Sequence, residues 1–504
     1  MNTRKTLGIA IGLLLFAVVL LLPAPEGMSH PAKKAAAVTI LMAVWWMTEA
    51  IPISATGLVP LALFPLLGIL DAKSTTVNYG NSIILLLLGG FFVAKAIELH
   101  NLHRRIALLI ISRMGTDKRL ILLSVILATA GISMWIANIT VALLMLPIGI
   151  AIASLEGDAG DGDRRSKFGV ALMLAIAYSA TIGGLGTLVG TTSNMIFAGM
   201  TKSLYPEAPE FGFLQWLLIG FPLVVILVPA MWVYMVWFFD IKGSLPGSKE
   251  MIRQELHSLG PMSKPERRVL AIFVLTALGW VFREDIAINA FTIPGWSSLI
   301  GIQHYADDAT VAIAGALLMF CIPTGIKLPE GKKGPAFLLD WEAARTVPWG
   351  VMVLVGGGYA IAAGFTSTGL VEWIGRELAF MVTLPTPVVL LAIVVCISLF
   401  TEVCSNTATA NIFLPILATM AVAGNFHPYL LMIPGTIASS FAFMLPSGTG
   451  PNAVVFGSGR VTIPEMAWCG VWLKVISIVL VTLLMYLIAA PVFGAYGGLP
   501  EWAR

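Results

Sequence analysis

Polar side chains gather in one short segment of an otherwise apolar chain, TEVCSNTATANIFLPIL, which runs from Thr401 to Leu417. Seven of its first ten residues carry a side chain that donates or accepts a hydrogen bond. An asparagine amide offers both donors and an acceptor, and a hydroxyl does either. Such groups can hydrogen-bond an anion or ligate a hard cation, so the segment indicates a binding site for small ions.

A related segment, SMWIANITVALLMLPI, begins 268 residues earlier at Ser133. At this shift Ala137-Asn138-Ile139 corresponds to Ser405-Asn406-Thr407, and a Gly-rich stretch follows each segment, at 183–197 and 444–456. Backbone that leaves a helix inside a membrane must line a cavity or be buried in protein. Broken helices present N-termini that favour an anion and free carbonyls that favour sodium. The pattern therefore predicts a small anion bound beside cations.

Basic residues are absent from the segments that would form this site. Lys and Arg do not occur in 121–155, 169–200 or 385–459, and Glu402 is the only acidic residue of the last range. An uncompensated charge at the centre of a bilayer costs at least several kcal/mol. Helix dipoles offset part of this, at best on the order of half a unit charge each. We therefore expect obligate coupling of the anion to co-bound cations.

The elements that position these residues are those of a membrane protein. Of the 504 residues 58% are hydrophobic and 11% charged, with a mean hydropathy of +0.90, which exceeds what a soluble core absorbs. A net charge of +3 is too small to suggest a nucleic-acid partner. We predict an all-α polytopic membrane protein with about 11 transmembrane helices, two re-entrant hairpins and two inverted-topology repeats, as in secondary transporters.

The predicted organisation follows the apolar stretches and their polar breaks. We expect an N-terminal helix and loop (1–35), a first repeat (36–240) with a hairpin at about 119–155 and a broken helix at about 169–200, a cytoplasmic linker (241–267), a second repeat (268–493) with a hairpin at about 386–422 and a broken helix at about 429–457, and a C-terminal tail (494–504).

Charge asymmetry predicts the orientation in the membrane. Basic residues cluster at Arg104 and Arg105, from Arg113 to Arg119, from Arg164 to Lys167, and from Lys242 to Arg268, which places these loops in the cytoplasm. The N-terminal stretch, with Arg4 and Lys5 before an apolar run, is interpreted as a retained first helix with a cytoplasmic N-terminus; a cleaved signal peptide is the alternative. The expected location is the inner membrane of a bacterium.

Several single residues allow a bland and a functional interpretation. Glu402 is either a structural carboxyl bonded to a nearby backbone break or a protonation site, and we favour the structural role. Glu49, beside Pro52, is expected at a solvated helix end. The four cysteines are expected to be buried small hydrophobes: Cys321, Cys396, Cys404 and Cys469.

Five stretches of the chain closely resemble the divalent anion:sodium symporter family of dicarboxylate, citrate and sulfate carriers. They are WWMTEAIPISATGLVPLALFPLLGI, GGFFVAKAIELHNLHRRIAL, MWIANITVALLMLPI, TEVCSNTATANIFLPI and MLPSGTGPNAVVFGSG, and the resemblance covers nearly the whole chain. It implies sodium-coupled symport of a small divalent anion, most often a C4-dicarboxylate such as succinate, malate or fumarate. It also implies a homodimer with an elevator mechanism, and it does not imply an enzyme.

The resemblance carries over to individual residues of both hairpin tips and both following loops. It implies substrate contacts from Asn138, Ile139, Thr140, Thr191, Thr192, Ser405, Asn406, Thr407, Thr449, Gly450 and Pro451. It implies two or more sodium ions, ligated by Ser133, Ala137, Asn138, Gly190, Thr401, Cys404, Asn406 and Gly448.

The first tip departs from the family pattern, because Ala137-Asn138-Ile139 stands where the family has Ser-Asn-Thr. Each lost hydroxyl hydrogen bond costs ~1 kcal/mol, and Thr140 is a candidate for compensation. A sodium-independent anion exchanger of the same fold, or a carrier of citrate, sulfate or another inorganic anion, therefore stays open as an alternative. An intramembrane enzyme would need a nucleophile or metal set that these hairpins lack.

Overall fold

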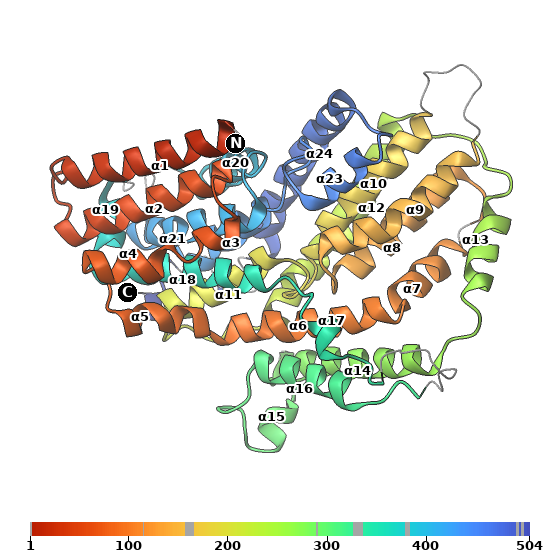
Figure 1. Ribbon diagram of the computed structural model, residues 1–504, viewed down its shortest axis with the longest axis horizontal. Coiled ribbons are helices and arrows are strands. Elements are labelled where there is room, and N and C mark those ends of the chain that lie inside the picture. The colour runs from red at the N-terminus through yellow and green to blue at the C-terminus, as the bar shows by residue number, and fades with distance from the viewer. Residues whose placement is uncertain are drawn as a thin grey trace.

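The computed structural model describes residues 3–113, 115–156, 166–288, 291–325, 336–377, 384–489, 493–494 and 498–503. Within these ranges the chain is helical, apart from one antiparallel strand pair, β1 (Ile286–Ile288) and β2 (Phe291–Ile293), in which Ile286 pairs with Ile293. The prediction of a helical fold is confirmed, and this small hairpin between two helices is the exception to it (Figure 1).

Fourteen helical elements precede the middle of the chain. They are α1 (Thr3–Leu21), α2 (His30–Thr48), α3 (Ile53–Thr56), α4 (Val59–Leu67), α5 (Ala72–Val77), η1 (Asn78–Gly80), α6 (Ser82–Leu99), α7 (Leu102–Ile111), α8 (Lys118–Ser133), α9 (Asn138–Ser154), α10 (Lys167–Gly184), α11 (Thr192–Leu204), α12 (Phe213–Phe238) and α13 (Ser248–Ser258).

The second part of the described chain repeats this alternation of long and interrupted helices. Its elements are α14 (Lys264–Val281), α15 (Trp296–Leu299), α16 (Asp308–Cys321), α17 (Trp341–Ala344), α18 (Trp349–Thr368), α19 (Leu370–Glu377), α20 (Thr386–Phe400), α21 (Asn406–Ala423), α22 (Pro428–Ala438), α23 (Gly450–Gly457), α24 (Ile463–Leu484), η3 (Met485–Ala489) and η4 (Glu501–Ala503).

Six of the described helical segments are long and apolar enough to cross a membrane, and several apolar helices are shorter. The predicted apolar stretch 36–69 is not continuous. α2 ends at Thr48, and Pro52 then starts a new direction, because proline cannot continue a helix through its missing N–H. The count of about 11 crossings stays a prediction, since helix length alone does not establish which short helices span.

Both predicted hairpins are pairs of helices joined by a short turn. α8 ends at Ser133 and α9 starts at Asn138, and α20 ends at Phe400 and α21 starts at Asn406. Both predicted broken helices are interrupted: residues 185–191 separate α10 from α11, and residues 439–449 separate α22 from α23.

The same left-handed turn recurs at the shift of 268 residues. Asn101 joins α6 to α7 with φ 56°, and Gly369 joins α18 to α19 with φ 74°. Residues other than glycine and asparagine rarely adopt this conformation. The two segments therefore share a bend as well as a sequence pattern, which supports the interpretation of the chain as two repeats.

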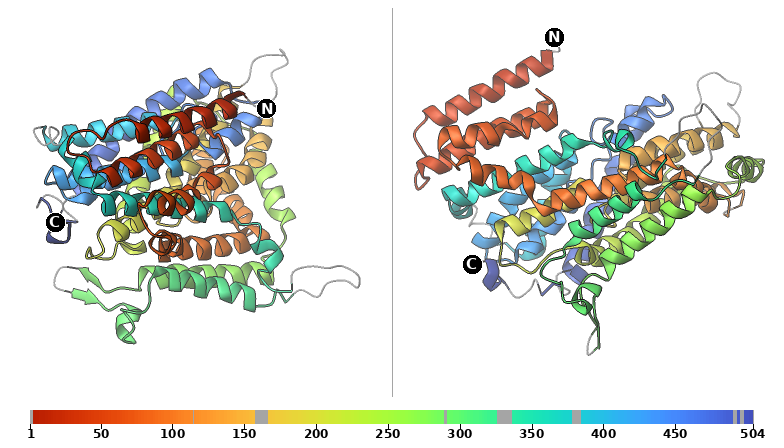
Figure 2. Two further views of the ribbon diagram at one scale, coloured as in Figure 1. Left: turned by 60° about the vertical axis from the view of Figure 1, so that its left-hand side comes forward. Right: turned by 60° about the horizontal axis from the view of Figure 1, so that its bottom comes forward.

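The helices form two groups that meet along α6, α11, α18 and α21. Figure 1 shows α8, α9, α10 and α12 packed together at one end and α1, α2 and α4 at the other. α14 and α16 form a separate layer against α6, which both views of Figure 2 show. Most buried apolar side chains belong to one large cluster, and a second, smaller cluster is centred on α2, α4 and α18.

Arg105 of α7 holds the polar linker between the two halves. Its guanidinium donates to the Glu266 carboxylate (Nε–Oε1 2.7 Å) and to the carbonyl of Gly260 (2.9 Å). Arg105 is 8% and Glu266 5% exposed, so the pair is shielded from solvent. The junction between α13 and α14 is thereby tied to the short amphipathic helix α7.

Candidate functional site

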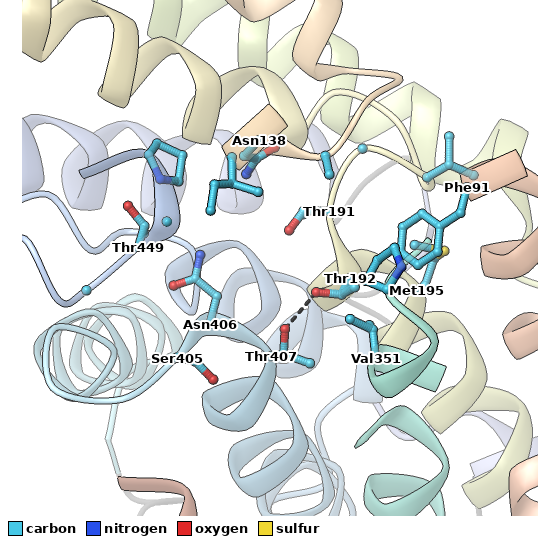
Figure 3. A pocket seen from close by; sticks show the side chains of 18 of the residues that line it. Phe91, Asn138, Thr191, Thr192, Met195, Val351, Ser405, Asn406, Thr407 and Thr449 are labelled. Carbon is cyan, nitrogen blue, oxygen red and sulfur yellow. Dashed lines mark hydrogen bonds between the residues drawn. The ribbon is translucent and has the colours of Figure 1, made fainter. Parts of the chain in front are cut away.

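One cavity of about 420 Å³ brings both hairpin tips and both helix breaks together (Figure 3). Most of its lining residues come from two segments of the first half and two of the second, which are far apart in sequence. The lining comprises Glu49, Phe91, Ala137, Asn138, Ile139, Val189, Gly190, Thr191, Thr192, Met195, Pro348, Val351, Ser405, Asn406, Thr407, Ser447, Gly448, Thr449, Gly450 and Pro451.

Four helices begin at this cavity. The residues that precede the first turns of α9, α11, α21 and α23 all line it, and they are Ala137, Thr191, Ser405 and Thr449. The first N–H groups of a helix lack intrahelical partners, and the helix dipole is positive at this end. The cavity is thus surrounded by partial positive charge from the backbone, which favours an anion without a basic side chain.

Oxygen atoms gather beside each tip. In the first half, Ser133 Oγ donates to Asn138 Oδ1 (2.9 Å) and to the Ala180 carbonyl (2.6 Å). In the second half, Thr401 Oγ1 donates to Asn406 Oδ1 (3.1 Å) and to the Ser439 carbonyl (2.5 Å). Ser133 and Thr401 are related by the shift of 268. Each cluster combines a hydroxyl, an amide oxygen and carbonyls near a helix C-terminus, a donor set that suits a hard cation such as sodium.

Close approach in the first half depends on Gly184. A Cβ added there would lie 2.5 Å from Asn138 Oδ1 and collide with the amide. The Gly-rich stretch at the end of α10 therefore allows the tip of the first hairpin to approach the break of the following helix. This gives the glycine pattern of the sequence a steric reason.

Two asparagines that lie outside the cavity lining hold the breaks in place. Asn194 Nδ2 donates to the carbonyls of Gly184 (3.1 Å) and Thr187 (2.7 Å). Asn452 Nδ2 donates to the carbonyls of Ala442 and Leu445, both at 3.0 Å. All three equivalent positions differ by 258 residues (452 − 194, 442 − 184, 445 − 187). The sequence comparison, which used one shift of 268, did not detect this match.

Both asparagines are fully buried, and neither side-chain Oδ1 has a hydrogen-bond partner within the described residues. A buried acceptor without a partner is costly unless a donor or a cation reaches it. These two oxygens therefore agree with the cation-type character of both breaks.

Glu402 has the structural role that we favoured for it. Its carboxylate accepts hydrogen bonds from the backbone N–H groups of Phe443 (2.9 Å), Met444 (3.1 Å) and Leu445 (3.1 Å), which lie in the break between α22 and α23. Lys474 of α24 forms an ion pair with it (Nζ–Oε1 2.6 Å). Lys474 does not line the cavity, so its charge serves Glu402 and not the cavity.

The two halves touch each other across the cavity. Thr192, the first residue of α11, and Thr407, in the first turn of α21, share a hydrogen bond between their hydroxyls (2.7 Å; Figure 3). The structure thus brings residues from both predicted half-sites into one polar surface.

The first tip shows where its departure from the family pattern matters. Ala137 has no side chain to cap α9, whereas the Ser405 hydroxyl accepts from the N–H of Ala408 (3.3 Å) and caps α21. Ile139 lies over Gly450, where an added Cβ would meet its side chain at 2.9 Å. The branched apolar side chain is therefore accommodated by a glycine from the second half.

Comparison with known proteins decides the family. A family model described as the sodium:sulfate symporter transmembrane region matches residues 3–494. The chain belongs to the sodium:sulfate symporter family. The sodium-dependent dicarboxylate transporters SdcS of Staphylococcus saprophyticus and Staphylococcus aureus are 41% and 39% identical to it over 500 residues, covering 98% of this chain and 93% of theirs.

Two solved transporter structures share the fold of this sodium:sulfate symporter family protein. Neisseria gonorrhoeae MtrF has a TM-score of 0.56 at 14% identity, covering 97% of this chain and 96% of its own. Alcanivorax borkumensis YdaH has a TM-score of 0.52 at 13% identity and covers 97% of both chains. The protein is thus an integral membrane transporter and not an enzyme.

Not every residue inferred from the family resemblance lines the cavity of this family member. Thr140 does not, and Ser133 and Thr401 lie behind the lining, bonded to the two asparagines. Cys404 is buried outside it. The sequence analysis missed apolar lining residues from distant helices, because nothing in their local sequence marks them: Phe91, Val189, Met195, Pro348 and Val351.

Two further expectations need correction. Cys404 and Cys469 are buried, but Cys321 and Cys396 are exposed on the outer faces of α16 and α20. Glu49 lies at the end of α2, as expected, but it lines the cavity.

Proposed function

We propose that this protein is a secondary active symporter that couples transport of a small divalent anion to sodium, with C4-dicarboxylates such as succinate, malate or fumarate as substrates. The observation that carries the proposal is the cavity: four helix N-termini face it, and among its described lining residues there is no lysine or arginine. Relatives with 39–41% identity over nearly the whole chain are named sodium-dependent dicarboxylate transporters, which supports this substrate class.

Sodium would occupy the two oxygen clusters, beside Ser133 and Asn138 in one half and beside Thr401 and Asn406 in the other. The backbone of Gly190 and of its counterpart Gly448 would complete them. Each ion adds positive charge next to the anion, in a site where helix dipoles alone offset only part of the anion's charge. Anion and cations therefore favour each other's binding, and the coupling is reciprocal. We propose at least two sodium ions.

We further propose an elevator mechanism in a homodimer. The moving part would contain both hairpins, both broken helices, α12 and α24, and the fixed part would contain α2, α6, α14, α16 and α18. The cavity lies where these groups meet, because Phe91, Pro348 and Val351 contribute to its lining beside the hairpin tips. The proposed location is a bacterial inner membrane, with two inverted repeats and a cytoplasmic N-terminus.

The altered first tip favours one alternative, a sodium-independent exchanger of the same fold. Ala137 and Ile139 leave the first half-site with fewer hydroxyls than the second. Citrate, sulfate and other inorganic anions are alternative substrates.

A thermal-shift screen of the purified protein tests these proposals together. Succinate, malate, fumarate, citrate, sulfate and phosphate are each titrated in sodium chloride and in choline chloride of equal concentration. We expect stabilisation by C4-dicarboxylates in sodium only, because a ligand that binds the native state raises its stability. Equal stabilisation in choline would support the exchanger, and stabilisation by sulfate or citrate alone would reject the dicarboxylate assignment.

Restoring the family pattern with Ala137→Ser and Ile139→Thr tests the role of the first tip. A serine cap stabilises α9 by ~1 kcal/mol, and the threonine adds a hydroxyl to the cavity. We expect the concentration of succinate for half-maximal stabilisation to fall by roughly five-fold, which corresponds to about one added hydrogen bond. Ala137→Ser alone is the control for the cap. No change in substrate preference or sodium response would mean that the departure is neutral.

A further inference from the structure

Glu49 is the only charged side chain among the described residues that line the cavity. Its carboxylate is exposed, and across the described ranges it makes no hydrogen bond or ion pair. Asn138, Asn406 and the threonines around it are neutral. A negative charge without a partner thus faces the space in which the proposed substrate, itself an anion, would bind.

The backbone holds Glu49 in an uncommon conformation. It ends α2 in the left-handed region, at φ 49° and ψ 39°, and its N–H donates to the Trp45 carbonyl. Glycine or asparagine would adopt this turn with less strain, and strained residues concentrate at functional sites. Helix α2 also packs against α21, the helix that begins at the second hairpin tip. The position is therefore set by α2 and its packing.

An ionised carboxylate is an acceptor only, so it cannot hydrogen-bond a fully ionised dicarboxylate. It repels such an anion and attracts a cation. Its effect on the anion is largest when no cation is present, and it declines once sodium ions place positive charge between the two.

We infer that Glu49 is a specificity-determining residue that makes anion binding conditional on sodium. With both cation clusters empty, Glu49 and the dianion oppose each other across the cavity. With sodium bound, the cations shield the anion from Glu49. The inference rests on the proposed function, since it presupposes a dianion and coupled cations in this cavity.

Succinate titrations of Glu49→Gln and of the parent protein, at sodium concentrations from near zero to saturating with choline as the balance, test the inference. The readout is the succinate concentration for half-maximal thermal stabilisation. At low sodium we expect Glu49→Gln to bind succinate roughly three- to ten-fold more tightly than the parent, because one like charge has been removed. At saturating sodium the two should agree within about two-fold, because bound cations outweigh the carboxylate.

Glu26 provides a matched control. It is an exposed carboxylate before the other end of α2, about 28 Å away along the 19-residue helix. Glu26→Gln removes the same charge without affecting the cavity and should behave like the parent. Glu49→Asp keeps the charge and should also keep the sodium dependence. Glu49→Asn, which suits the left-handed turn, is a second neutral variant in case Glu49→Gln folds poorly.

Three results would overturn the inference. If Glu49→Gln and Glu49→Asn show the parent's sodium dependence, the charge has no role. If they weaken succinate binding at every sodium concentration, Glu49 is a ligand and not a filter. If the parent itself binds succinate equally in sodium and in choline, the proposed function fails and the inference fails with it, which the parent titration alone reveals.

Discussion

Asn406→Ala and Asn138→Ala should each abolish the stabilisation by a dicarboxylate in the presence of sodium. Each asparagine stands at the first position of a helix that begins at the cavity, with its Oδ1 bonded to the hydroxyl of Thr401 or Ser133. Its amide thus lies between the oxygen cluster proposed for sodium and the space proposed for the anion. Hydrogen bonds to charged groups contribute about 1.5–3 kcal/mol each, so loss of one amide removes contacts to both ions.

The measurement is a succinate titration in sodium by thermal shift, repeated with the sodium concentration varied at fixed succinate. Asn78→Ala is the control, because the Asn78 amide donates to the Ser74 carbonyl (2.9 Å) at the surface, away from the cavity. It should bind as the parent does. Parent-like binding by both Asn138→Ala and Asn406→Ala would reject this cavity as the substrate site.

Lys474→Met should destabilise the folded protein by about 3–5 kcal/mol, because it leaves the buried Glu402 carboxylate without its cation. Lys474 is 3% and Glu402 5% exposed, and Lys474 also donates to the Ser398 carbonyl (2.5 Å). The three backbone N–H groups that Glu402 accepts would then be held by an unpaired charge in an apolar environment. We therefore also expect the break between α22 and α23 to loosen and succinate affinity to fall.

Melting temperatures and chemical unfolding of the single variants and of the double variant Glu402→Gln with Lys474→Met measure this coupling. The double variant removes both charges and should recover much of the loss. Lys95→Met is the control, since Lys95 pairs with Glu98 at a partly exposed site, and such pairs contribute only about 0–1 kcal/mol. If Lys474→Met were as stable as the parent, Glu402 would be neutral, and its interpretation as a protonation site would be favoured instead.

Local sequence was sufficient for the elements of the site. The hairpin tips at Asn138 and Asn406 were predicted because polar residues inside apolar runs have few explanations in a membrane. The helix breaks were predicted because glycine-rich stretches between apolar helices favour backbone outside the helix. The equivalent pair Asn194 and Asn452 was not recognised as such, because the shift between the halves changes from 268 to 258 after the hairpins.

Contacts between distant segments were not predictable in this way. Lys474 lies 72 residues after Glu402 (474 − 402), and only a lone charge in an apolar helix indicated that it needed a partner. Glu49 was assigned to a solvated helix end, since its neighbours in sequence do not reveal what faces it. The accommodation of Ile139 by Gly450 likewise joins two halves of the chain.

By itself, the sequence determined the helical membrane class, the family and the polar tips, because these follow from composition, period and local backbone chemistry. Only the tertiary structure decided that four helix N-termini share one cavity, that Lys474 neutralises Glu402, and that a carboxylate of α2 faces the tips. The physical reason is that charge interactions and steric fit depend on distances in space. In this chain, the packing of segments hundreds of residues apart sets those distances.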